Sequence, residues 1–444
     1  MKKVLVLGAG MVSRPLVDYL LGKGFSLVLG DLYRDQAEAV IAARQNGRAV
    51  AVDSADDRAI EPLIREADLT VSLLPPAFHP RIAACCLRLG KHFLSASYVS
   101  PEMRDLNEAA KQRDLIFLNE IGLDPGLDHL TAMEVIDRLH REGYRILGFE
   151  SDCGGIPAKD AANNALRYKM SWSPAGVLGA LTRPARFRKM GHVVEVPGEE
   201  MLQHAEIRII EGHGVYESTP NADSLSYGRL YGIENAANLR RGTLRYPGWA
   251  SFWRFLLSLG FLRREPRMEF RNIGVLDGLF CLAGEERPQD FTEFVLERAP
   301  EQASLILEKV HSLGILDPNC RLNGSYSAFD IMLERAADTL RYQPGEADLV
   351  VLHHQWLVEK DKVRELWTST LAREGTPGGT TAMAFLVGVP AAIAARLVLE
   401  GRILDRGVLI PTSPELYVPI LEELKTLGLS HEIRKESASS PAAG

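Results

Sequence analysis

Six short and almost wholly apolar runs recur through the first 120 residues, and each is separated from the next by a stretch of helical periodicity. The runs are 4–8, 26–31, 49–53, 69–75, 93–98 and 115–120. Apolar runs without polar alternation are typical of strands buried on both faces, with the intervening helices as the cover. The pattern predicts a doubly wound parallel sheet, the Rossmann type of α/β domain.

After residue 120 the pattern changes. A helical stripe covers 127–139, a strand leads into a glycine turn at 154–155, and short strand-like pieces follow over 200–250. Helical periodicity dominates 250–345, and 348–358 again has the pattern of a strand. The polar tail after residue 432 is rich in serine and alanine, and we expect it to be disordered.

Composition excludes several classes of function. The net charge of −7 argues against a general nucleic-acid surface or an anionic membrane surface. The most apolar late segment, 382–399, contains a proline and an arginine and falls short of the ~20 clean residues of a membrane span. None of the five cysteines forms a C-x-x-C pair, so we expect no metal site. These features predict a cytoplasmic protein.

A glycine loop follows the first strand. Gly8 permits a tight turn, and Gly10 lets the backbone approach a pyrophosphate. Met11 and Val12 then open a helix whose free N–H groups favour an anion. The third position of the motif is Ser13 instead of glycine or alanine. This context predicts a bound dinucleotide; the alternative is an ordinary turn between a strand and a helix.

Three further residues are expected around the cofactor. Asp31 ends the second strand. A carboxylate at this position accepts a hydrogen bond from the 2′-hydroxyl of a ribose and repels a 2′-phosphate. This favours NAD, with NADP as the alternative because Arg34 lies nearby; Asp31 as a plain surface acid also remains open. Asp53 is expected to face the adenine of the cofactor, and Leu74 is expected to border that ring.

Three polar segments are expected to meet at the carboxyl ends of the strands: 97–101, 119–129 and 151–155. In the second, Asp124 precedes Pro125, which suits the first position of a helix, so Asp124 is expected to be the helix N-cap. The same location is where a nicotinamide should lie, and a carboxylate there can hold an amine or accept a proton. The structural and the functional interpretation of Asp124 both remain open.

Eight motifs together resemble the glutamate-forming saccharopine dehydrogenases. They are GAGMVSRP (8–15), SLLPPAFHP (72–80), SASYVSPEM (95–103), NEIGLDPGLDH (119–129), CGGIPA (153–158), NALRYKMSWSPAGVL (164–178), RRGTLRYPG (240–248) and LIPTSPELYVPILEEL (409–424). The resemblance covers most of the chain. It looks most similar to the dehydrogenase half of the bifunctional lysine-degrading enzymes of plants and animals.

The resemblance implies an architecture. It places a Rossmann domain at 1–125, a mixed α/β substrate and dimerisation domain at 126–250 and 346–389, and a helical insertion at 251–345. Segment 390–432 is expected to pack back on the first domain, and 433–444 to form the disordered tail. A homodimer is the implied assembly, and a small amino-acid-derived molecule, not nucleic acid or a membrane, is the implied partner.

The resemblance also implies a reaction and its residues. Saccharopine, NAD(P)⁺ and water would give glutamate and 2-aminoadipate 6-semialdehyde through an imine, without a metal. The implied catalytic residues are Asp124, Tyr98 and Cys153. Ser97 and Tyr98 would border substrate and nicotinamide. A substrate carboxylate would be held by Thr243, Leu244 and Arg245, since arginine binds carboxylates through paired hydrogen bonds.

Two departures from the family pattern leave alternatives open. The family often has an arginine where this chain has Ala222, and Pro-Glu where it has 159–160. Other cations are candidates to compensate, or the substrate is another secondary amine, such as a carboxylated polyamine. The candidates are Arg240, Arg241, Lys169 and Arg167. A non-catalytic dinucleotide-binding regulator is the third reading, against which Asp124, Tyr98 and Cys153 argue.

Overall fold

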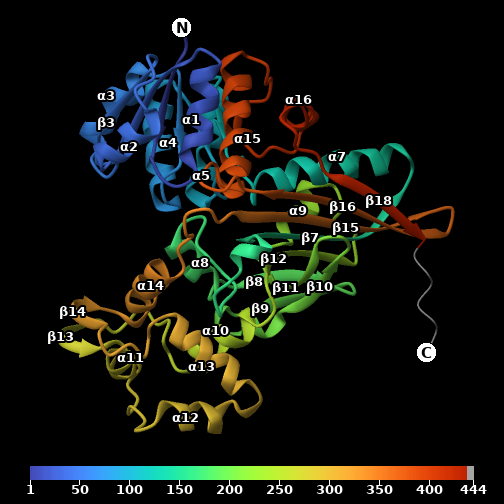
Figure 1. Ribbon diagram of the computed structural model, residues 1–444. Coiled ribbons are helices and arrows are strands. Elements are labelled where there is room, and N and C mark those ends of the chain that lie inside the picture. Colours follow the sequence, from blue (N-terminus) through green and yellow to red (C-terminus); the bar gives the residue numbers. More distant parts are fainter. Residues whose placement is uncertain (438–444) are drawn as a thin grey trace.

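The computed structural model describes residues 1–437 (Figure 1). The first domain is built on a seven-stranded parallel sheet in the order β17-β6-β5-β4-β1-β2-β3. Its strands are β1 (Lys3–Leu7), β2 (Ser26–Asp31), β3 (Gly47–Ala51), β4 (Leu69–Ser72), β5 (His92–Ser95), β6 (Ile116–Leu118) and β17 (Gly407–Leu409). The predicted doubly wound sheet is therefore confirmed.

Helices cover both faces of this sheet, as the apolar runs require. Along β1, Val4 and Val6 pack towards one layer of helices, whereas Leu5 and Leu7 pack towards the other. The first layer contains α1 (Ser13–Gly22), α2 (Arg34–Ile41), α15 (Ala382–Leu399) and α16 (Pro414–Thr426). The second contains α3 (Asp57–Glu66), α4 (His79–Leu89), α5 (Pro101–Asp105) and α6 (Asn107–Gln112).

The long apolar helix α15 belongs to the interior. Contrary to the expectation from its proline and arginine, it is long and apolar enough to cross a membrane, but 83% of it is buried inside the protein. It stands beside α1 (Figure 1), and the two backbones approach closely at Gly388. A Cβ atom there would lie 3.0 Å from the backbone nitrogen of Leu16 and the carbonyl oxygen of Val12. The apolar composition of 382–399 is thus explained by packing.

The second domain is a mixed nine-stranded sheet whose main path is β10-β11-β12-β7-β15-β16-β18, with β8 paired to β12 and β9 paired to β8. Its strands are β7 (Arg145–Pro157), β8 (Ala185–Lys189), β9 (His192–Val196), β10 (Glu206–Ile210), β11 (Gly214–Pro220), β12 (Asn238–Arg245), β15 (Asp348–Lys360), β16 (Val363–Glu374) and β18 (Glu432–Ser437). The helices α7 (Leu127–Arg141), α8 (Pro174–Ala180) and α9 (Ser226–Leu230) accompany it.

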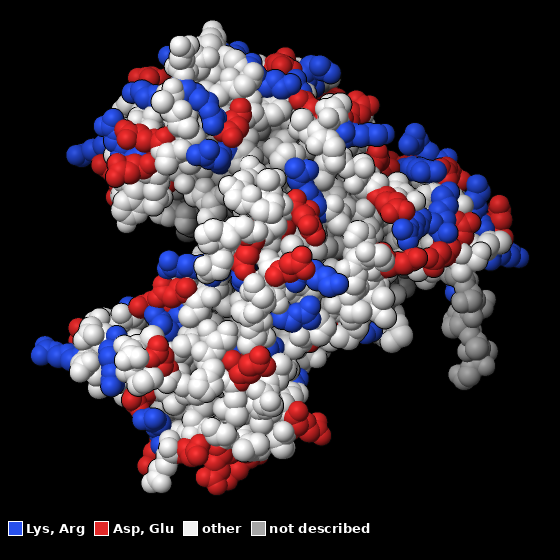
Figure 2. All heavy atoms as spheres, viewed as in Figure 1, with Lys and Arg blue, Asp and Glu red and all other residues white. Residues whose placement is uncertain are grey.

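The third part is mainly helical and packs under the second sheet (Figure 1). It contains α10 (Trp249–Ser258), α11 (Val275–Ala283), α12 (Phe291–Arg298), α13 (Ala303–Ser312) and α14 (Ala328–Thr339). A two-stranded antiparallel sheet of β13 (Met268–Gly274) and β14 (Arg321–Tyr326), which α11, α12 and α13 separate in the chain, was not foreseen from the helical periodicity. Figure 2 shows an open notch between this part and the first domain.

One boundary prediction is wrong. Residues 433–437 were expected in a disordered tail, but they form most of β18, which pairs antiparallel with β16. The pairing supplies backbone hydrogen-bond partners along the edge of the sheet, and Ile433 packs against the main core. A short polar strand of this kind has no apolar run that would reveal it. The remainder of the predicted tail, 438–444, lies outside the described residues.

Candidate active site

The chain folds back on itself in a tight loop between β6 and α7. The N–H of Gly122 donates to the carbonyl of Pro125 at 3.0 Å. The N–H of Leu127 donates to the carbonyl of Gly122 at 2.9 Å, and that of Asp128 to the carbonyl of Leu123 at 3.0 Å. Loop carbonyls therefore satisfy the first N–H groups of the helix, which usually depend on a capping side chain.

The prediction that Asp124 caps this helix is therefore wrong. Helix α7 begins at Leu127, and Gly126 is its N-cap residue. Gly126 has φ = +145°, and a Cβ atom on it would lie 2.1 Å from the backbone nitrogen of Gly122. Only glycine fits this crossing. The result is that the carboxylate of Asp124 is free of the helix and turns towards the second domain.

Three side chains meet the carboxylate of Asp124. The hydroxyl of Tyr98 donates to Oδ1 at 3.2 Å. The amide nitrogen of Asn221 donates to Oδ2 at 3.4 Å, and the guanidinium of Arg241 forms an ion pair with Oδ1. Tyr98 was predicted at this site, whereas Asn221 was not. Asp124 thus lies at the junction of the two domains, held from both sides.

Arg241 links two carboxylates. Its Nη2 also donates to Asp128 at 2.6 Å, so one guanidinium serves both acids. The guanidinium carbon lies 4.3 Å from the ring centre of Tyr227 and 5.5 Å from that of Tyr98, in cation–π geometry. Arg241 is 1% exposed. Within residues 1–437 its Nη1 is buried and has no hydrogen-bond partner.

The two carboxylates differ in their proton affinity. Burial raises the pKa of Asp124 above its ordinary value, although Arg241 opposes the rise. Burial acts on Asp128 in the same direction, but His129, Arg241 and the Gly126 N–H outweigh it and lower its pKa. Asp128 therefore stays ionised and balances Arg241, while Asp124 is the acid with the affinity to take up a proton.

A second buried network supports this loop. Glu120 accepts from the N–H of Val99 at 3.0 Å and lies 2.9 Å from Nε2 of His129. The hydroxyl of Tyr227 donates to Glu120 at 3.3 Å, and Nδ1 of His129 lies 2.7 Å from the hydroxyl of Tyr231. The segment 119–129 is polar between two apolar runs because its side chains form this network.

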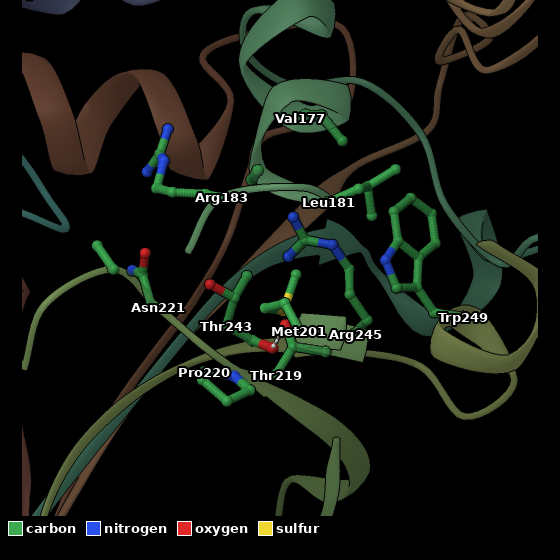
Figure 3. Close-up of a pocket in the computed structure, with 12 residues that line it drawn as sticks. Val177, Leu181, Arg183, Met201, Thr219, Pro220, Asn221, Thr243, Arg245 and Trp249 are labelled. Carbon is green, nitrogen blue, oxygen red and sulfur yellow. Dashed lines mark hydrogen bonds between the residues drawn. The ribbon is translucent and has the colours of Figure 1, made fainter. Parts of the chain in front are cut away.

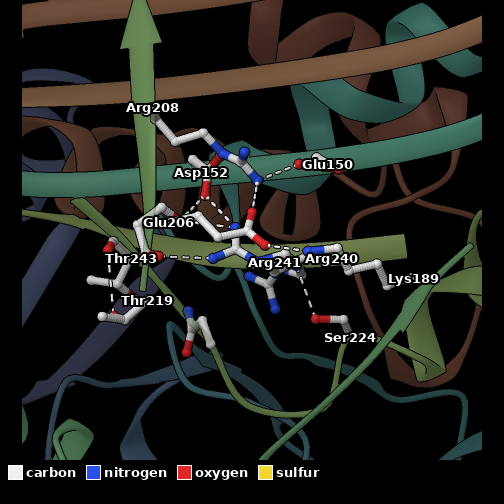
Figure 4. A network of polar contacts seen from close by, with 12 residues as sticks. Glu150, Asp152, Lys189, Glu206, Arg208, Thr219, Ser224, Arg240, Arg241 and Thr243 are labelled. Carbon is white, nitrogen blue, oxygen red and sulfur yellow. Dashed lines mark hydrogen bonds and ion pairs between the residues drawn. The ribbon is translucent and has the colours of Figure 1, made fainter. Parts of the chain in front are cut away.

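Strand alternation on β12 separates two sets of polar groups. Arg240 faces Asp152, which also binds Arg208 and Ser218 on the same side of the sheet (Figure 4). Its neighbour Arg241 faces the opposite side and meets Asp124. Successive residues of a strand point to opposite faces, so one ion-pair network fixes the strand while the other serves the site.

A pocket opens beside this junction (Figure 3). It is a small pocket that is partly open to solvent, and its lining residues are Val177, Ala180, Leu181, Arg183, Met201, Thr219, Pro220, Asn221, Ala222, Thr243, Arg245 and Trp249. The predicted carboxylate partners Thr243 and Arg245 are both present. Leu244 is not, because its side chain points to the other face of β12 and is fully buried in the second core.

Cys153 lies on β7, directly opposite Thr243 in the parallel register. It is 5% exposed, and burial together with the carboxylates of Asp124 and Asp128 raises the pKa of its thiol well above the ordinary value. A thiol in this state stays protonated at neutral pH. Cys153 is therefore near the site, as expected, but as a neutral neighbour and not as a base.

The glycine loop has the shape that a dinucleotide requires. Gly8 has φ = +103°, and a Cβ atom there would lie 3.2 Å from the backbone of Leu73. At Gly10 a Cβ atom would meet no atom of residues 1–437 within 4 Å, so the backbone there is open to a ligand. Met11 is 54% exposed beside it, and Val12 is the N-cap residue of α1. These residues fit a bound pyrophosphate.

Asp31 has a role that the sequence did not indicate. Its carboxylate accepts from the N–H of Ala9 at 2.7 Å and from that of Tyr33 at 2.9 Å. It therefore fixes the conformation of the glycine loop. Leu74 packs near Gly8, as its predicted place at the end of β4 requires. Asp53 is exposed and accepts from the N–H of Ala55 at 2.8 Å.

Ser97 is also engaged. Its hydroxyl lies 2.9 Å from Nε2 of His79, whose Nδ1 lies 3.0 Å from the hydroxyl of Ser72. Burial lowers the pKa of His79 to about 4, so the ring is neutral. The chain of three side chains fixes Ser97 beside Tyr98, at the carboxyl ends of β4 and β5.

Three of the cations proposed to compensate for Ala222 are committed elsewhere. Arg240 binds Asp152, and Lys169 is 3% exposed and paired with Glu346. Arg167 stacks on the ring of Tyr246 at 4.2 Å. Only Arg241 reaches the site, through Asp124. Arg183, which lines the same pocket as Ala222, was not among these four candidates, although the basic cluster 183–189 to which it belongs could hold an acidic small molecule.

Comparison with known proteins gives consistent results. Two family models match, "Saccharopine dehydrogenase NADP binding domain" at 4–118 and "Saccharopine dehydrogenase C-terminal domain" at 122–429. The saccharopine dehydrogenase [NADP(+), L-glutamate-forming] of Pyricularia oryzae is 37% identical, with 96% of each chain covered. The apo saccharopine dehydrogenase (L-Glu forming) structure from Saccharomyces cerevisiae has a TM-score of 0.85 at 32% identity, covering 98% of this chain and 100% of that one.

Bifunctional relatives match as well. The alpha-aminoadipic semialdehyde synthase of Arabidopsis thaliana is 33% identical over 96% of this chain, which spans 44% of that protein. The chain is therefore similar in sequence to the bifunctional enzymes, as expected, and also to the fungal enzymes.

The preference for NAD inferred from Asp31 is not supported. The matching family model and the fungal relatives are described by NADP. The physical reason lies in the glycine loop, because the carboxylate of Asp31 is used by the N–H groups of Ala9 and Tyr33. Its position at the end of β2 therefore carries no information about a 2′-phosphate.

The eight sequence motifs, the two family models that together cover 4–118 and 122–429, and the architecture shared with the yeast structure all agree. This chain belongs to the saccharopine dehydrogenase family.

Proposed function

We propose that this protein oxidises saccharopine with NADP⁺ and water to glutamate and 2-aminoadipate 6-semialdehyde, a reaction of lysine metabolism. The observation that carries the proposal is the position of Asp124. Its carboxylate is largely buried at the domain junction, with the side chain 13% exposed, is bound by Tyr98 and Arg241, and is linked through Asn221 to the pocket that contains Arg245.

The reaction needs a base and a carboxylate-binding pocket. A hydride leaves the carbon that becomes the aldehyde, and the secondary amine loses its proton, which gives an imine. Water adds to the imine carbon, and the carbinolamine breaks its C–N bond after the nitrogen regains a proton. Glutamate leaves with the amine. The nicotinamide, when bound, accepts the hydride, and no metal is required.

Asp124 is the group suited to these proton transfers. Burial raises its pKa, which increases its affinity for a proton, and Arg241 keeps it from being permanently protonated. It first takes a proton from the amine or from water and then returns one to the leaving nitrogen. Tyr98 donates to the same carboxylate and holds it in one orientation.

The pocket supplies the binding of the carboxylates. Arg245 stacks on Tyr168 at 4.8 Å and on Trp249 at 5.4 Å, which fixes its guanidinium plane. Thr243 lies two residues away on the same face of β12 and adds a hydroxyl. Burial in this aromatic setting strengthens a charge-assisted hydrogen bond to a substrate carboxylate.

The test follows the absorbance of reduced nicotinamide. The purified protein is mixed with saccharopine and NADP⁺, and in a parallel reaction with NAD⁺. We expect turnover with NADP⁺ and formation of glutamate, measured by amino-acid analysis. No turnover with either cofactor would refute the proposal. Turnover with NAD⁺ alone would refute its cofactor assignment.

A second candidate substrate is a carboxylated polyamine. It is favoured by Ala222, which stands where the family often has an arginine. The two candidates differ in the number of carboxylates that the pocket must bind. The same assay with a carboxylated polyamine gives a higher kcat/KM than saccharopine if the second candidate is right. The homodimer and the cytoplasmic location stay predictions of the sequence.

A further inference from the structure

We propose that Arg183 binds a substrate carboxylate in the pocket beside Asp124 and so selects a substrate that carries more than one carboxylate. The inference rests on the proposed function, because it names a further residue of the same binding site. Its first support is the charge of the pocket. Two of the twelve lining residues are arginines, and none of the twelve is an acid.

The first of these arginines has limited capacity. The Nη1 of Arg245 donates to the carbonyl of Leu244 at 2.7 Å. Among residues 1–437 its Nε has no partner, although it is buried. A buried guanidinium with an unused donor is costly until an anion binds it. Arg245 can therefore hold one carboxylate, and a second carboxylate needs another cation.

Arg183 is the cation available. It lies in the turn after α8, and its side chain is exposed. In the part of the chain that the structure describes it forms no ion pair, whereas Arg186, three residues on, pairs with Glu195 and Asp223. In Figure 3 the side chain of Arg183 lies at the edge of the pocket and points away from that of Arg245, which lies beside Trp249.

Backbone pairing keeps Arg183 close to Ala222. The N–H of Arg186 donates to the carbonyl of Ala222 at 3.0 Å, and the N–H of Ser224 donates to the carbonyl of Arg186 at 2.7 Å. This pairing sets the turn that carries Arg183 against the segment that carries Ala222. The small side chain of Ala222 leaves the intervening space to a ligand.

The arrangement fits a molecule with separated carboxylates. Saccharopine carries three, and two guanidinium groups in one pocket can bind two of them. Asn221 lines the pocket and donates to Asp124, so the bound groups lie one side chain away from the proposed base. Arg183 does not touch Asp124, so it should affect binding and not the chemical step.

The test compares Arg183→Gln and Arg183→Lys with the wild type in the saccharopine and NADP⁺ assay. Losing one charged contact is expected to raise the KM for saccharopine by about tenfold. We expect kcat and the KM for NADP⁺ to stay within about twofold, and Arg183→Lys to recover part of the loss. The control is Arg229→Gln, which removes an exposed arginine on α9 outside the pocket.

A second variant distinguishes the loss of positive charge from a change in loop conformation as the cause of a raised KM. Arg183→Gln combined with Ala222→Arg returns a cation to the same pocket, and we expect it to recover the KM. An unchanged KM in Arg183→Gln would overturn the inference. So would a raised KM that neither Arg183→Lys nor Ala222→Arg recovers, because the loop would then be the cause. A wild type inactive on saccharopine would instead refute the proposed function.

Discussion

Asp124 and Arg241 form an ion pair across the junction between the two domains, although 117 positions separate them in the chain. One comes from the loop that leaves the parallel sheet, and the other from the middle of β12. The pair therefore couples the geometry of the proposed base to the relative position of the domains.

Replacement of the base should remove activity and leave the fold intact. Asp124→Asn keeps the shape and loses the proton acceptor, so kcat should fall by about 10²–10⁴-fold. The measurement is steady-state turnover with saccharopine, alongside a thermal unfolding curve. Asp105→Asn, at an exposed acid on α5, should retain normal turnover. Normal turnover in Asp124→Asn would remove Asp124 from the chemistry.

Removal of Arg241 should reduce stability. Arg241→Gln leaves Asp124 and Asp128 without their shared cation in a buried place, which costs about 3–5 kcal/mol of unfolding free energy. Urea unfolding monitored by circular dichroism measures the loss. Arg65→Gln breaks an exposed pair with Glu61 and should leave the unfolding midpoint unchanged. Equal midpoints for the two variants would contradict the structural role of Arg241.

Acid should destabilise the second domain through His354. Burial lowers the pKa of this histidine from 6.5 to about 3, so the unfolded chain binds its proton more readily than the folded one. Its stability contribution is fully present above pH 6.5 and is lost as the pH falls towards the folded pKa, by about 2–4 kcal/mol. His354→Gln should flatten the dependence of unfolding free energy on pH over that range.

The control for this experiment is His192→Gln, at an exposed histidine on β9. Its pH dependence should match that of the wild type. A slope in His354→Gln as steep as in the wild type would show that other groups cause the acid sensitivity.

The loop crossing at Gly126 should tolerate no side chain. Gly126→Ala adds a Cβ atom 2.1 Å from the backbone of Gly122, at a φ of +145° that alanine avoids. We expect loss of turnover together with a lower unfolding temperature. Gly143, at the other end of α7, has φ = +82°, but a Cβ atom there would meet nothing within 4 Å in the described part of the chain, so Gly143→Ala should cost only about 1 kcal/mol. Similar effects of both substitutions would contradict the crossing.

Asp31 should affect both cofactors alike. Asp31→Ala removes the acceptor for the N–H groups of Ala9 and Tyr33, so the glycine loop loses its support. The KM for NADP⁺ and the KM for NAD⁺ should both rise by a similar factor. A selective gain for NADP⁺ would instead indicate that the carboxylate repels a 2′-phosphate, as the sequence alone suggested.

The strands of the first domain were predictable from sequence because each is buried on both faces and therefore apolar throughout. Tyr98 and Asp124 were predictable for a related reason, since parallel strands end at the same edge of the sheet. β18 was not, because its stability comes from pairing with β16 and not from its own composition.

Two features of the site depend on contacts between distant segments. The capping of α7 by the carbonyls of Gly122 and Leu123 depends on how a loop crosses itself, and side-chain preferences do not record it. Which of the two candidates Arg240 and Arg241 reaches the site depends on which face of β12 turns towards α7. Such contacts are long-range, and local sequence patterns carry little information on them.

The parallel pairing of β17 with β6 joins Gly407 to Ile116, so the outermost strand of the first sheet comes from the far end of the chain. During synthesis the first six strands leave the ribosome long before their last neighbour exists. Until β17 has been synthesised, β6 is an unpaired edge strand, and a strand of another chain can pair with such an edge. Its brevity, three residues, limits that risk for the nascent protein.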